Sequence, residues 1–395
     1  MPRTKKSPGN KESIGYLLTS MNLLTVIPMS LVKSILEKED KLSKRERKLP
    51  AHVLVMLIIF MSIYSDYNTS DVFAAMCSTL FPEMLPDRRF DVGEVAISQA
   101  RQRLGDEVLK KLFLAVCRPM TTNRTQGAWY RQWRIMAVDG SDVDLPDEAK
   151  IREKYPKHSN DKSDYPFPQL KYAALQEIGS RAYTSVAIGN DLDSEMSLAA
   201  RVENDLEPDM LVIADRYYVG VDNIKRVNDR GAACLFRARG NLKLKPVKRL
   251  KDGSYTAVLK KSKSKESVLV RVIEYTVRFK GRKSCETIRL VTNILDPDMA
   301  PAAELASLYS SRWNIETGFR EIKSTLRMKQ KTLRSKKPEL AQQEFWGVLL
   351  AHYIVKRVIH DAAVANGRPP SDISTKATIH VIKQFAKGKL FSPTA

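Results

Sequence analysis

The N-terminal third of the chain carries its apolar residues at helical spacing. Residues 1–14 are polar and basic, which predicts a disordered arm, and residues 15–125 then follow a helical pattern. The clearest predicted helices cover residues 53–64 and 71–80. We therefore expect a helical N-terminal domain, which its basic residues mark as a candidate DNA-binding domain.

Residues 92–105, VGEVAISQARQRLG, predict a further helix with a basic face. Ser98 is a plausible N-cap, because a serine hydroxyl can accept a hydrogen bond from a free amide of the first turn. Arg101 and Arg103 follow it and are typical of a helix that contacts DNA. The solvated face of a packed helix explains the same two residues equally well, so both interpretations stay open.

Residues 126–231 change to an alternation of strands and helices. The apolar run over residues 133–145 predicts a strand that ends in an acidic turn. Gly179-Ser180 separates two further strand-like runs and indicates a hairpin. This order predicts an α/β sheet with helices packed on it. The other expected elements are a long loop over 146–167, strands over 169–178, 181–189, 209–218 and 234–240, and helices over 194–206 and 221–228.

Residues 232–300 break the alternation and predict a basic, β-rich insertion. Three strand-like runs lie there, SYTAVLKK, VLVRVIEYTV and ETIRLVTNIL, with basic turns such as LKPVKRLKDG between them. Residues 232–295 hold 17 Lys and Arg against 4 Asp and Glu, a net charge of +13. More than half of the net charge of the chain, which is +21, therefore lies in this small region.

The remaining residues predict two long helices and a tail. The helices cover residues 302–327 and 339–364 within a second part of the core, and residues 366–395 are basic and poorly patterned. The longest apolar run, over residues 53–63, is too short to span a bilayer. No apolar segment closely follows the charged N-terminus, so we expect neither a signal peptide nor a membrane anchor. A soluble, cytoplasmic protein is the resulting expectation.

The charge of the chain points to a polyanionic partner. The 66 Lys and Arg outnumber the 45 Asp and Glu, and such a surplus gains affinity for phosphates by releasing their counterions. A soluble protein that is merely basic is the alternative. The cysteines are too widely spaced for a zinc pattern or a disulfide framework, and we expect free thiols. They are Cys77, Cys117, Cys234 and Cys285.

Two aspartates follow apolar strands of the predicted sheet. Asp139 comes after the run that begins at Trp133, and Asp215 follows MLVIA. Ligands of open α/β sheets gather beyond the carboxyl ends of the strands. Two carboxylates that converge there repel each other unless a cation lies between them, and oxygen-rich acidic sites favour Mg²⁺ or Mn²⁺. The alternatives are that the aspartates only cap turns, or that Asp142 or Asp144 takes the place of Asp139.

A third acid lies on the long helix of the second core part. Tyr309, Arg312, Glu316 and Lys323 fall within an arc of about 60° on a regular α-helix. Beside them runs an apolar stripe that should pack on the core: Leu308, Ile315, Phe319, Ile322 and Leu326. An ordinary salt-bridged surface helix would show similar charges. The polar face borders a core stripe, and the helix lies far downstream of the two strand-end aspartates in the sequence. Both features favour a role for Glu316 in one site with Asp139 and Asp215.

These residues resemble a known family. The spacing Tyr309-x2-Arg312-x3-Glu316-x6-Lys323 is similar to the YREK signature of bacterial DDE transposases of the insertion-sequence-four type. The Asp-Gly-Ser turn at Asp139 and the Asp-Arg pair at Asp215 fit the same family. The resemblance covers residues 20–360 and includes the SQARQRLG segment.

The resemblance implies an RNase H-like mixed sheet flanked by helices, with a helical N-terminal domain and an inserted β-rich subdomain. It implies a DNA transposase that cuts insertion-element ends and joins them to target DNA. Asp139, Asp215 and Glu316 are then the catalytic metal ligands for two Mg²⁺ or Mn²⁺ ions, and two-metal phosphoryl transfer is the expected mechanism. The expected partners are double-stranded DNA and a second copy in a homodimer, with the protein on the nucleoid when bound. The candidate DNA contacts are Tyr309, Arg312, Lys323, Arg216, Arg101, Arg103, Lys248 and Arg249.

One departure from the family leaves the reaction route open. Close relatives hold a flipped base with a tryptophan in the β insertion, whereas all four tryptophans of this chain lie outside it. Tyr255, Tyr275 or Phe279 could stack on such a base instead, although aromatic residues commonly fill strands. Hairpin formation on the ends and successive hydrolysis by water both remain possible routes. An RNase H-type nuclease without strand transfer, and an inactive DNA-binding protein, are the rival functions.

Overall fold

A computed structural model gives the fold of most of the chain. The predicted arm, residues 1–14, lies outside the described part. The structure describes residues 25–43, 49–76, 92–157, 159–160, 163–262, 264–278, 285–326 and 332–391.

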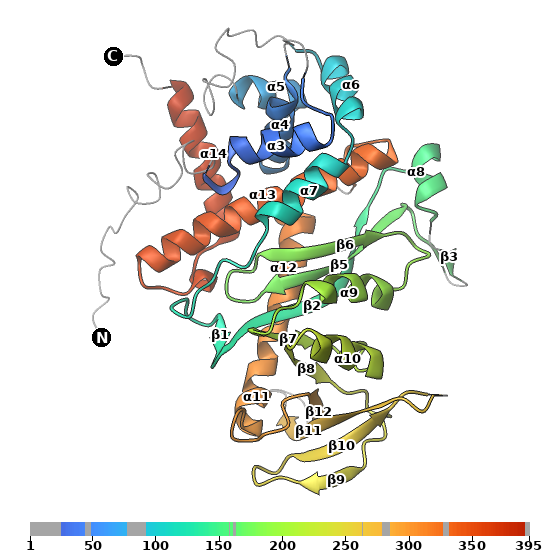
Figure 1. Ribbon diagram of the computed structural model, residues 1–395. Helices are drawn as coiled ribbons and strands as arrows, with labels where there is room; N and C mark the ends of the chain where they lie inside the picture. The colour runs from blue at the N-terminus through green and yellow to red at the C-terminus, as the bar shows by residue number, and fades with distance from the viewer. Residues whose placement is uncertain are drawn as a thin grey trace.

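The N-terminal domain is helical, as predicted (Figure 1). Helix α4 is apolar on all sides, and each residue from Val53 to Ile63 is buried, which identifies it as the central helix of the bundle. The predicted helix at 53–64 is thus confirmed. No helix in the described parts of the chain is long and apolar enough to cross a membrane. The helices are α3 Met29–Lys38, α4 Ala51–Ile63, α5 Thr69–Ala75, α6 Glu94–Leu104 and α7 Glu107–Val116.

Two details of the N-terminal prediction differ from the structure. Helix α6 has Gly93 as its N-cap, so the prediction of Ser98 as N-cap was wrong. The helix begins at Glu94 and already buries Ile97 against the core, so Ser98 lies inside the helix. Helix α5 begins at Thr69, earlier than predicted, because the Asn68 side chain accepts a hydrogen bond from the Asp71 amide at 2.8 Å. Residues 77–80 of that prediction lie outside the described part.

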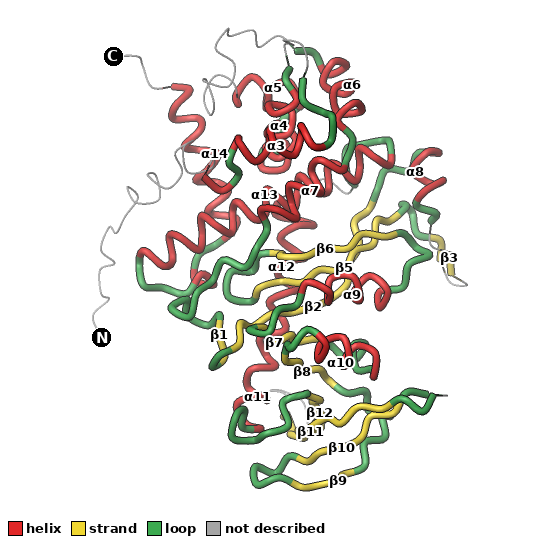
Figure 2. The backbone as a smooth tube through the Cα atoms, viewed as in Figure 1, coloured by secondary structure: helices red, strands yellow, loops and turns green. Residues whose placement is uncertain are grey.

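A single mixed sheet forms the centre of the molecule (Figures 1 and 2). Its strand order is β6-β5-β2-β7-β8-β12-β11-β10-β9, with the short β1 paired to β2. Strands β2, β7 and β8 are parallel, whereas β5 and β6 extend the sheet as the predicted antiparallel hairpin. This confirms the predicted RNase H-like mixed sheet. The core strands are β1 Trp129–Tyr130, β2 Trp133–Asp144, β5 Gln169–Glu177, β6 Tyr183–Gly189, β7 Met210–Ala214 and β8 Ala233–Arg237.

Helices cover both faces of the core strands. In β2, Ile135 and Ala137 pack in the same apolar cluster as the helices α12 Trp313–Arg320 and α13 Pro338–Ala365. Met136 and Val138 point to the opposite face and pack with the helices α9 Glu195–Val202 and α10 Val221–Asp229. Burial on both faces explains why the core strands are apolar at consecutive positions.

The β-rich insertion continues the core sheet and does not form a sheet of its own. Strand β12 pairs with β8 through Leu290 opposite Arg237, and β11, β10 and β9 follow in order. The three predicted strands are confirmed. The segment predicted as a basic turn holds a further edge strand, β9, which is exposed at every residue and begins with a proline, as edge strands tolerate. The strands are β9 Pro246–Arg249, β10 Tyr255–Lys260, β11 Ser267–Arg278 and β12 Cys285–Thr292.

Two segments predicted to lack regular structure contain it. The loop over 146–167 includes the helix α8 Ala149–Lys154 and the small hairpin of β3 Ser159–Asn160 and β4 Ser163–Asp164. The tail includes the helix α14 Thr375–Phe391, which packs along α13. In both cases a pair of buried residues at helical spacing anchors the segment, and these pairs are Ile151 with Tyr155 and Ile379 with Ile382.

The predicted long helix at 302–327 is helical but irregular. The helix α11 Ala302–Tyr309 passes through a 3₁₀ turn at Ser310–Arg312 into α12, and a π-helical turn follows at Glu321–Leu326. The regular spacing assumed for this segment is therefore wrong in detail. Such changes of helical type are frequent at functional sites.

Candidate active site

Asp139 lies inside strand β2 and not at its end. The strand continues to Asp144, and Asp139 pairs with Ala174 of β5. The parallel partner β7 ends earlier, with Ile213 opposite Ala137. One side of β2 therefore has no strand beside it at Asp139. The expectation of a strand-terminal Asp139 was wrong, because the pairing with β5 keeps the polar residues after it in the sheet.

Asp215 directly follows β7, as predicted, and lies near Asp139. Its Oδ1 accepts a hydrogen bond from the Tyr217 amide at 2.7 Å, and Oδ1 of Asp139 accepts one from the Gly140 amide at 2.9 Å. Burial raises the pKa of Asp139 to about 7, and the negative charges of Glu195 and Asp215 act in the same direction. The Gly140 amide and Arg312 oppose them. The site thus holds more negative charge than its own cations balance.

Arg312 connects Asp139 with Glu316. Its guanidinium lies 3.8 Å from Oδ2 of Asp139 and 3.0 Å from Oε1 of Glu316. Arg312 comes from the 3₁₀ turn and Glu316 from the first turn of α12, on the face of the sheet to which Asp139 projects. The structure therefore brings all three predicted carboxylates to one place.

Tyr309 lies beside these carboxylates too. Lys323, in contrast, lies beside a later residue of β2, Asp142. Tyr309 is buried, and this burial raises its pKa to about 12, against the nearby positive charges of Arg312 and Arg237. Lys323 pairs with Asp142, with 2.7 Å between Nζ and Oδ1.

The acids near Asp139 have other partners. Asp142 binds Lys323, and Asp144 accepts a hydrogen bond from Gln169 at 3.0 Å. Asp147 pairs with Arg152 and Lys157 at 2.6 and 2.7 Å. The neighbouring acids thus have partners of their own, whereas the charges of Asp215 and Arg312 act on Asp139, and this favours Asp139 as the member of the site.

The sequence interpretation missed a fourth carboxylate, Glu195. It lies in the first turn of α9, and its Oε1 accepts a hydrogen bond from the Tyr218 hydroxyl at 3.0 Å. A Cβ atom at Gly140 would lie 2.6 Å from Cγ of Glu195. An acid in the first helical turn is an ordinary feature, so no pattern in the chain distinguishes Glu195 from a capping residue.

The donor atoms of the site fit a hard divalent cation. They are carboxylate oxygens, which Mg²⁺ and Mn²⁺ prefer. Cys117 and Cys234 are free and buried elsewhere in the core. Within the described ranges, no three His, Cys, Asp or Glu residues are already grouped closely enough to hold a metal ion. Arg312 stands among the acids in this arrangement.

Among the predicted DNA contacts outside the helical segment that carries Glu316, one residue is buried and four are exposed. Arg101 is buried, and its guanidinium donates to Gln343 at 2.8 Å, to Ser335 at 3.0 Å and to the Leu340 carbonyl at 3.1 Å. It therefore joins α6 to α13 and is not accessible to DNA, and its prediction as a DNA contact was wrong. The exposed candidates are Arg103, Arg216, Lys248 and Arg249.

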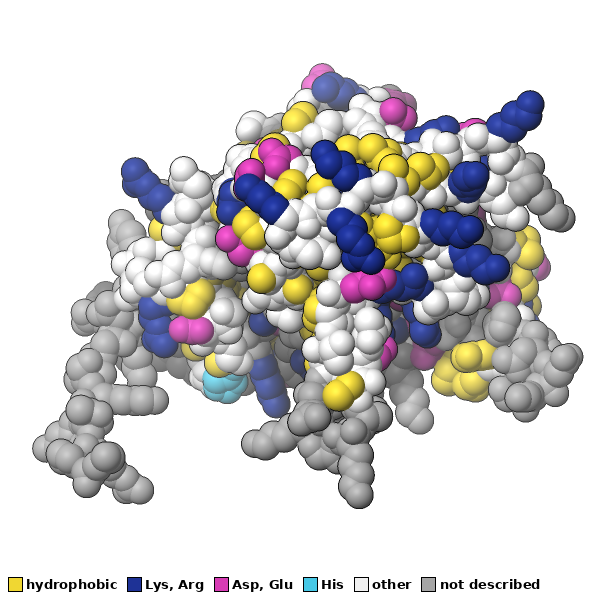
Figure 3. All heavy atoms as spheres, turned by 90° about the horizontal axis from the view of Figure 1, so that it is seen from below, with side chains coloured by type: hydrophobic (Ala, Val, Ile, Leu, Met, Phe, Trp, Pro, Cys, Tyr) yellow, Lys and Arg dark blue, Asp and Glu magenta, His cyan; other side chains and the backbone are white. Residues whose placement is uncertain are grey.

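Lys and Arg side chains spread over the end of the molecule that the insertion forms. Seen from that end, they outnumber the Asp and Glu side chains (Figure 3). Lys248 and Arg249 belong to the outermost strand, β9, and are exposed. Arg216 follows Asp215 directly and is also exposed. Exposed basic residues thus lie both on the edge strand β9 and directly beside the candidate active site.

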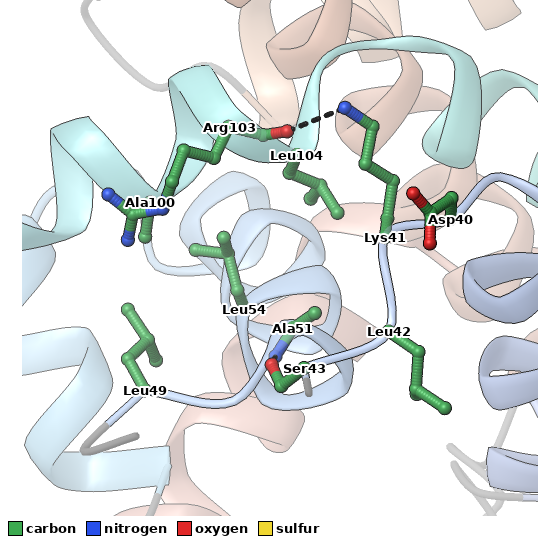
Figure 4. A pocket seen from close by; sticks show the side chains of 10 residues that line it. All are labelled: Asp40, Lys41, Leu42, Ser43, Leu49, Ala51, Leu54, Ala100, Arg103 and Leu104. Atoms are coloured by element: carbon green, nitrogen blue, oxygen red, sulfur yellow. Dashed lines mark hydrogen bonds between the residues drawn. The ribbon is translucent and has the colours of Figure 1, made fainter. Parts of the chain in front are cut away.

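Arg103 lines a pocket of the N-terminal domain between α4 and α6 (Figure 4). The side chain of Lys41 donates to the Arg103 carbonyl at 2.9 Å across this pocket. Leu54 and Leu104 contribute apolar lining. None of the acids of the candidate active site lines the pocket, so we assign no chemistry to it.

The aromatic residues considered for a flipped base are unequally placed. Tyr255 is buried and donates from its hydroxyl to Glu274 at 2.8 Å, so it packs in the sheet. Tyr275 is half-buried, and Phe279 lies outside the described residues. Trp313, outside the insertion, is 63% exposed, and the Arg312 guanidinium lies 4.9 Å from its ring centroid.

A mixed sheet with acids on adjacent strands and on a late helix is the arrangement of a DDE-type recombinase. The chain matches the family model described as Transposase DDE domain over residues 131–354. Residues 18–114 match the model described as Insertion element 4 transposase N-terminal. The chain therefore belongs to the DDE transposases of the insertion element 4 type. It is a DNA transposase, an enzyme that cleaves DNA and transfers strands, and such transposases generally depend on divalent metal ions.

Two proteins of similar sequence agree with this assignment. The chain is 29% identical over 380 residues to Transposase InsG for insertion sequence element IS4 of Escherichia coli (strain K12), covering 92% of this chain and 81% of the relative. It is 23% identical over 137 residues to Putative transposase InsZ of the same organism, covering 34% and 46%. Among solved structures, a piggyBac transposase synaptic complex with hairpin DNA aligns with 97% of this chain and 84% of that chain, at 12% identity and a TM-score of 0.47.

Proposed function

We propose that Asp139, Asp215 and Glu316 are the catalytic residues of this transposase and that together they hold two Mg²⁺ or Mn²⁺ ions. The observation that carries this assignment is the position of Arg312, which contacts both Asp139 and Glu316, while Asp215 is close enough to raise the pKa of Asp139. When bound, the ions would activate the attacking oxygen and stabilise the leaving oxygen of a phosphodiester.

Arg312 and Lys323 would exchange their carboxylate partners for DNA phosphates. Each now neutralises an acid of β2, Arg312 at Asp139 and Lys323 at Asp142. Bound metal ions would balance the charge of these acids, and the side chains of Arg312 and Lys323 would then be free to turn toward the scissile strand. A planar guanidinium can then bind two phosphate oxygens, and the ammonium acts as a point charge. Tyr309 would line the same contact from its buried position.

The DNA partner would be the inverted-repeat ends of the element and the target duplex. The exposed residues Lys248 and Arg249 lie on β9, Arg216 follows Asp215, and Arg103 lies on α6 of the N-terminal domain. A homodimer is expected because the reaction requires two ends to be held together, and nucleoid association would follow from binding DNA. The order of steps would be nicking, hairpin formation and opening, then strand transfer, with successive hydrolysis as the alternative route.

The test uses Glu316→Ala in the full-length protein, with DNA that carries the inverted repeats flanking the coding region. We expect end binding to persist and cleavage with Mg²⁺ or Mn²⁺ to disappear, because Glu316 is half-exposed and its loss leaves the core intact. Glu153→Ala, at an exposed site on α8, is the matched control and should cleave normally. Loss of end binding together with cleavage would make Glu316 a folding residue and overturn the assignment. Gel analysis of the cut ends distinguishes hairpins from open ends.

A further inference from the structure

Glu195 approaches the active site from the face of the sheet opposite to Glu316. Successive strand residues project to opposite faces, so Asp139 faces α12 and Gly140 faces α9. A Cβ atom at residue 140 would lie 2.6, 2.8 and 3.1 Å from Cγ, Cδ and Oε1 of Glu195. Only glycine leaves room for this carboxylate against the strand, beside Asp139 and at the side of β2 that no strand covers.

Two contacts fix Glu195 at this position. Helix α9 is capped by Ser194, whose hydroxyl accepts a hydrogen bond from the Ser197 amide at 3.1 Å. The Tyr218 hydroxyl, on a fully buried side chain, donates to Oε1 of Glu195 at 3.0 Å. The Tyr218 amide also donates to the Asp215 carbonyl at 3.2 Å. Tyr218 therefore ties Glu195 to the turn that carries Asp215.

Within the described ranges, no basic side chain pairs with the carboxylate of Glu195. Arg312 serves the other face, where it contacts Asp139 and Glu316. Over the parts of the chain that the structure describes, no Lys or Arg forms an ion pair with Glu195. An exposed glutamate normally turns toward water, whereas Tyr218 holds this one beside two other acids. An arrangement that holds several acids together, with Arg312 as their basic neighbour on the other face only, is suited to a cation from solution.

We propose that Glu195 is a fourth carboxylate of this metal site, which reaches the ion held by Asp139 and Asp215 through the gap that Gly140 leaves. This inference rests on the proposed function, because it adds a residue to the same site. The role also assigns a purpose to Tyr218, which acts as a positioning residue for Glu195. The acids would then surround the reacting centre from both faces of the sheet.

The test measures Mn²⁺ binding by the full-length protein with end DNA bound, using the electron paramagnetic resonance signal of free Mn²⁺. We expect Glu195→Gln to weaken Mn²⁺ binding by about 10- to 100-fold while end binding is kept. Cleavage should recover in part when the Mn²⁺ concentration is raised. Glu207→Gln makes the same chemical change at an exposed site before β7, at the opposite end of that strand, and should leave both unchanged.

Tyr218→Phe and Gly140→Ala provide independent variants. Both should weaken Mn²⁺ binding, the first by releasing Glu195 and the second by displacing it. Unchanged Mn²⁺ affinity in Glu195→Gln, beside a clear loss in Asp215→Asn, would overturn the role of Glu195 and leave the proposed function standing. Unchanged affinity in Asp215→Asn, or no Mn²⁺ binding by the unsubstituted protein, would overturn both.

Discussion

Lys356 and Glu321 form an ion pair in the protein interior, with 2.7 Å between Nζ and Oε2. Their side chains are 2% and 9% exposed. His352 also contacts Oε2 of Glu321 at 3.2 Å, and the Thr375 hydroxyl donates to Oε1 at 2.7 Å. Glu321 begins the π-helical turn after α12, Lys356 belongs to α13, and Thr375 begins α14. This cluster therefore fixes the helix that carries Glu316.

Replacing one partner of this pair should destabilise the protein strongly. Lys356→Met leaves the Glu321 carboxylate buried without its cation, and breaking such pairs costs about 3–5 kcal/mol. Urea unfolding measures this cost. The double variant Glu321→Met/Lys356→Met removes both charges and should be more stable than Lys356→Met alone. If the two substitutions instead add their separate costs, the pair is not energetically coupled.

The stability that Glu321 contributes should resist mild acid. Burial alone would raise the pKa of Glu321, but the hydrogen bond with His352 and the charge of Lys356 lower it well below its ordinary value. A lowered folded-state pKa stabilises the fold above the unfolded pKa, and this contribution declines as pH falls toward the folded one. The difference in unfolding free energy between the unsubstituted protein and Glu321→Gln should thus stay constant from about pH 8 to about pH 5 and shrink below about pH 4.3. A decline that begins near neutral pH would contradict the lowered pKa.

The raised pKa of Asp139 predicts that its contribution to stability depends on pH in the opposite way. Burial and the charges of Glu195 and Asp215 raise its pKa to about 7. The protonated form therefore stabilises the fold below the ordinary aspartate pKa, and this contribution is lost as pH rises through about 7. Asp139→Asn cannot ionise, so without metal its melting temperature should exceed that of the unsubstituted protein by a margin that grows from about pH 4 to about pH 8. Asp229→Asn, at an exposed position ending α10, is the control, and a margin independent of pH would refute the raised pKa.

The sequence predicted the sheet well because burial on both faces leaves a strong signal. The runs over residues 135–138 and 210–214 are apolar at every position, and the hairpin between them has an unambiguous turn. Asp215 was placed correctly for the same reason, since it directly follows such a run. Asp139 was misplaced within its strand, because the pairing of β2 with the distant β5 extends the strand through polar residues that have no strand signal of their own.

Side-chain roles set by tertiary contacts were beyond the sequence pattern. Arg101 looks like a surface residue of a basic helix, yet Gln343, from a helix far along the chain, buries it. Glu195 becomes a member of the site only because Gly140 and Tyr218 meet it in space. The spacing of Tyr309 to Lys323 was informative without the helix being regular. Its role as a signature of this chain stays a prediction.

Gly318 sets the distance between α12 and the sheet. A Cβ atom there would lie 2.1 Å from Nε2 of Gln176 and 2.6 Å from the Tyr183 hydroxyl, both on the hairpin strands. Gly318→Ala should displace α12 and lower cleavage activity, with a stability cost of about 1–3 kcal/mol from overpacking. The control is Gly240→Ala, where nothing lies within 4 Å of the added methyl group. Cleavage and urea unfolding are measured on both variants. A normal rate of DNA cleavage by Gly318→Ala would argue against this account.

Arg101 and Arg103 should separate stability from DNA binding. Arg101→Ala removes the charged donor from the buried side-chain oxygen of Gln343, and an unpaired buried group costs about 1–3 kcal/mol, so urea unfolding should show a clear loss. Arg103→Ala changes an exposed side chain and should shift stability by no more than about 0.5 kcal/mol. If Arg103 contacts a phosphate, its loss should lower the slope of log affinity against log salt by about 1. Normal stability in Arg101→Ala would restore the DNA-contact interpretation of that residue, and an unchanged salt slope in Arg103→Ala would remove Arg103 from the DNA interface.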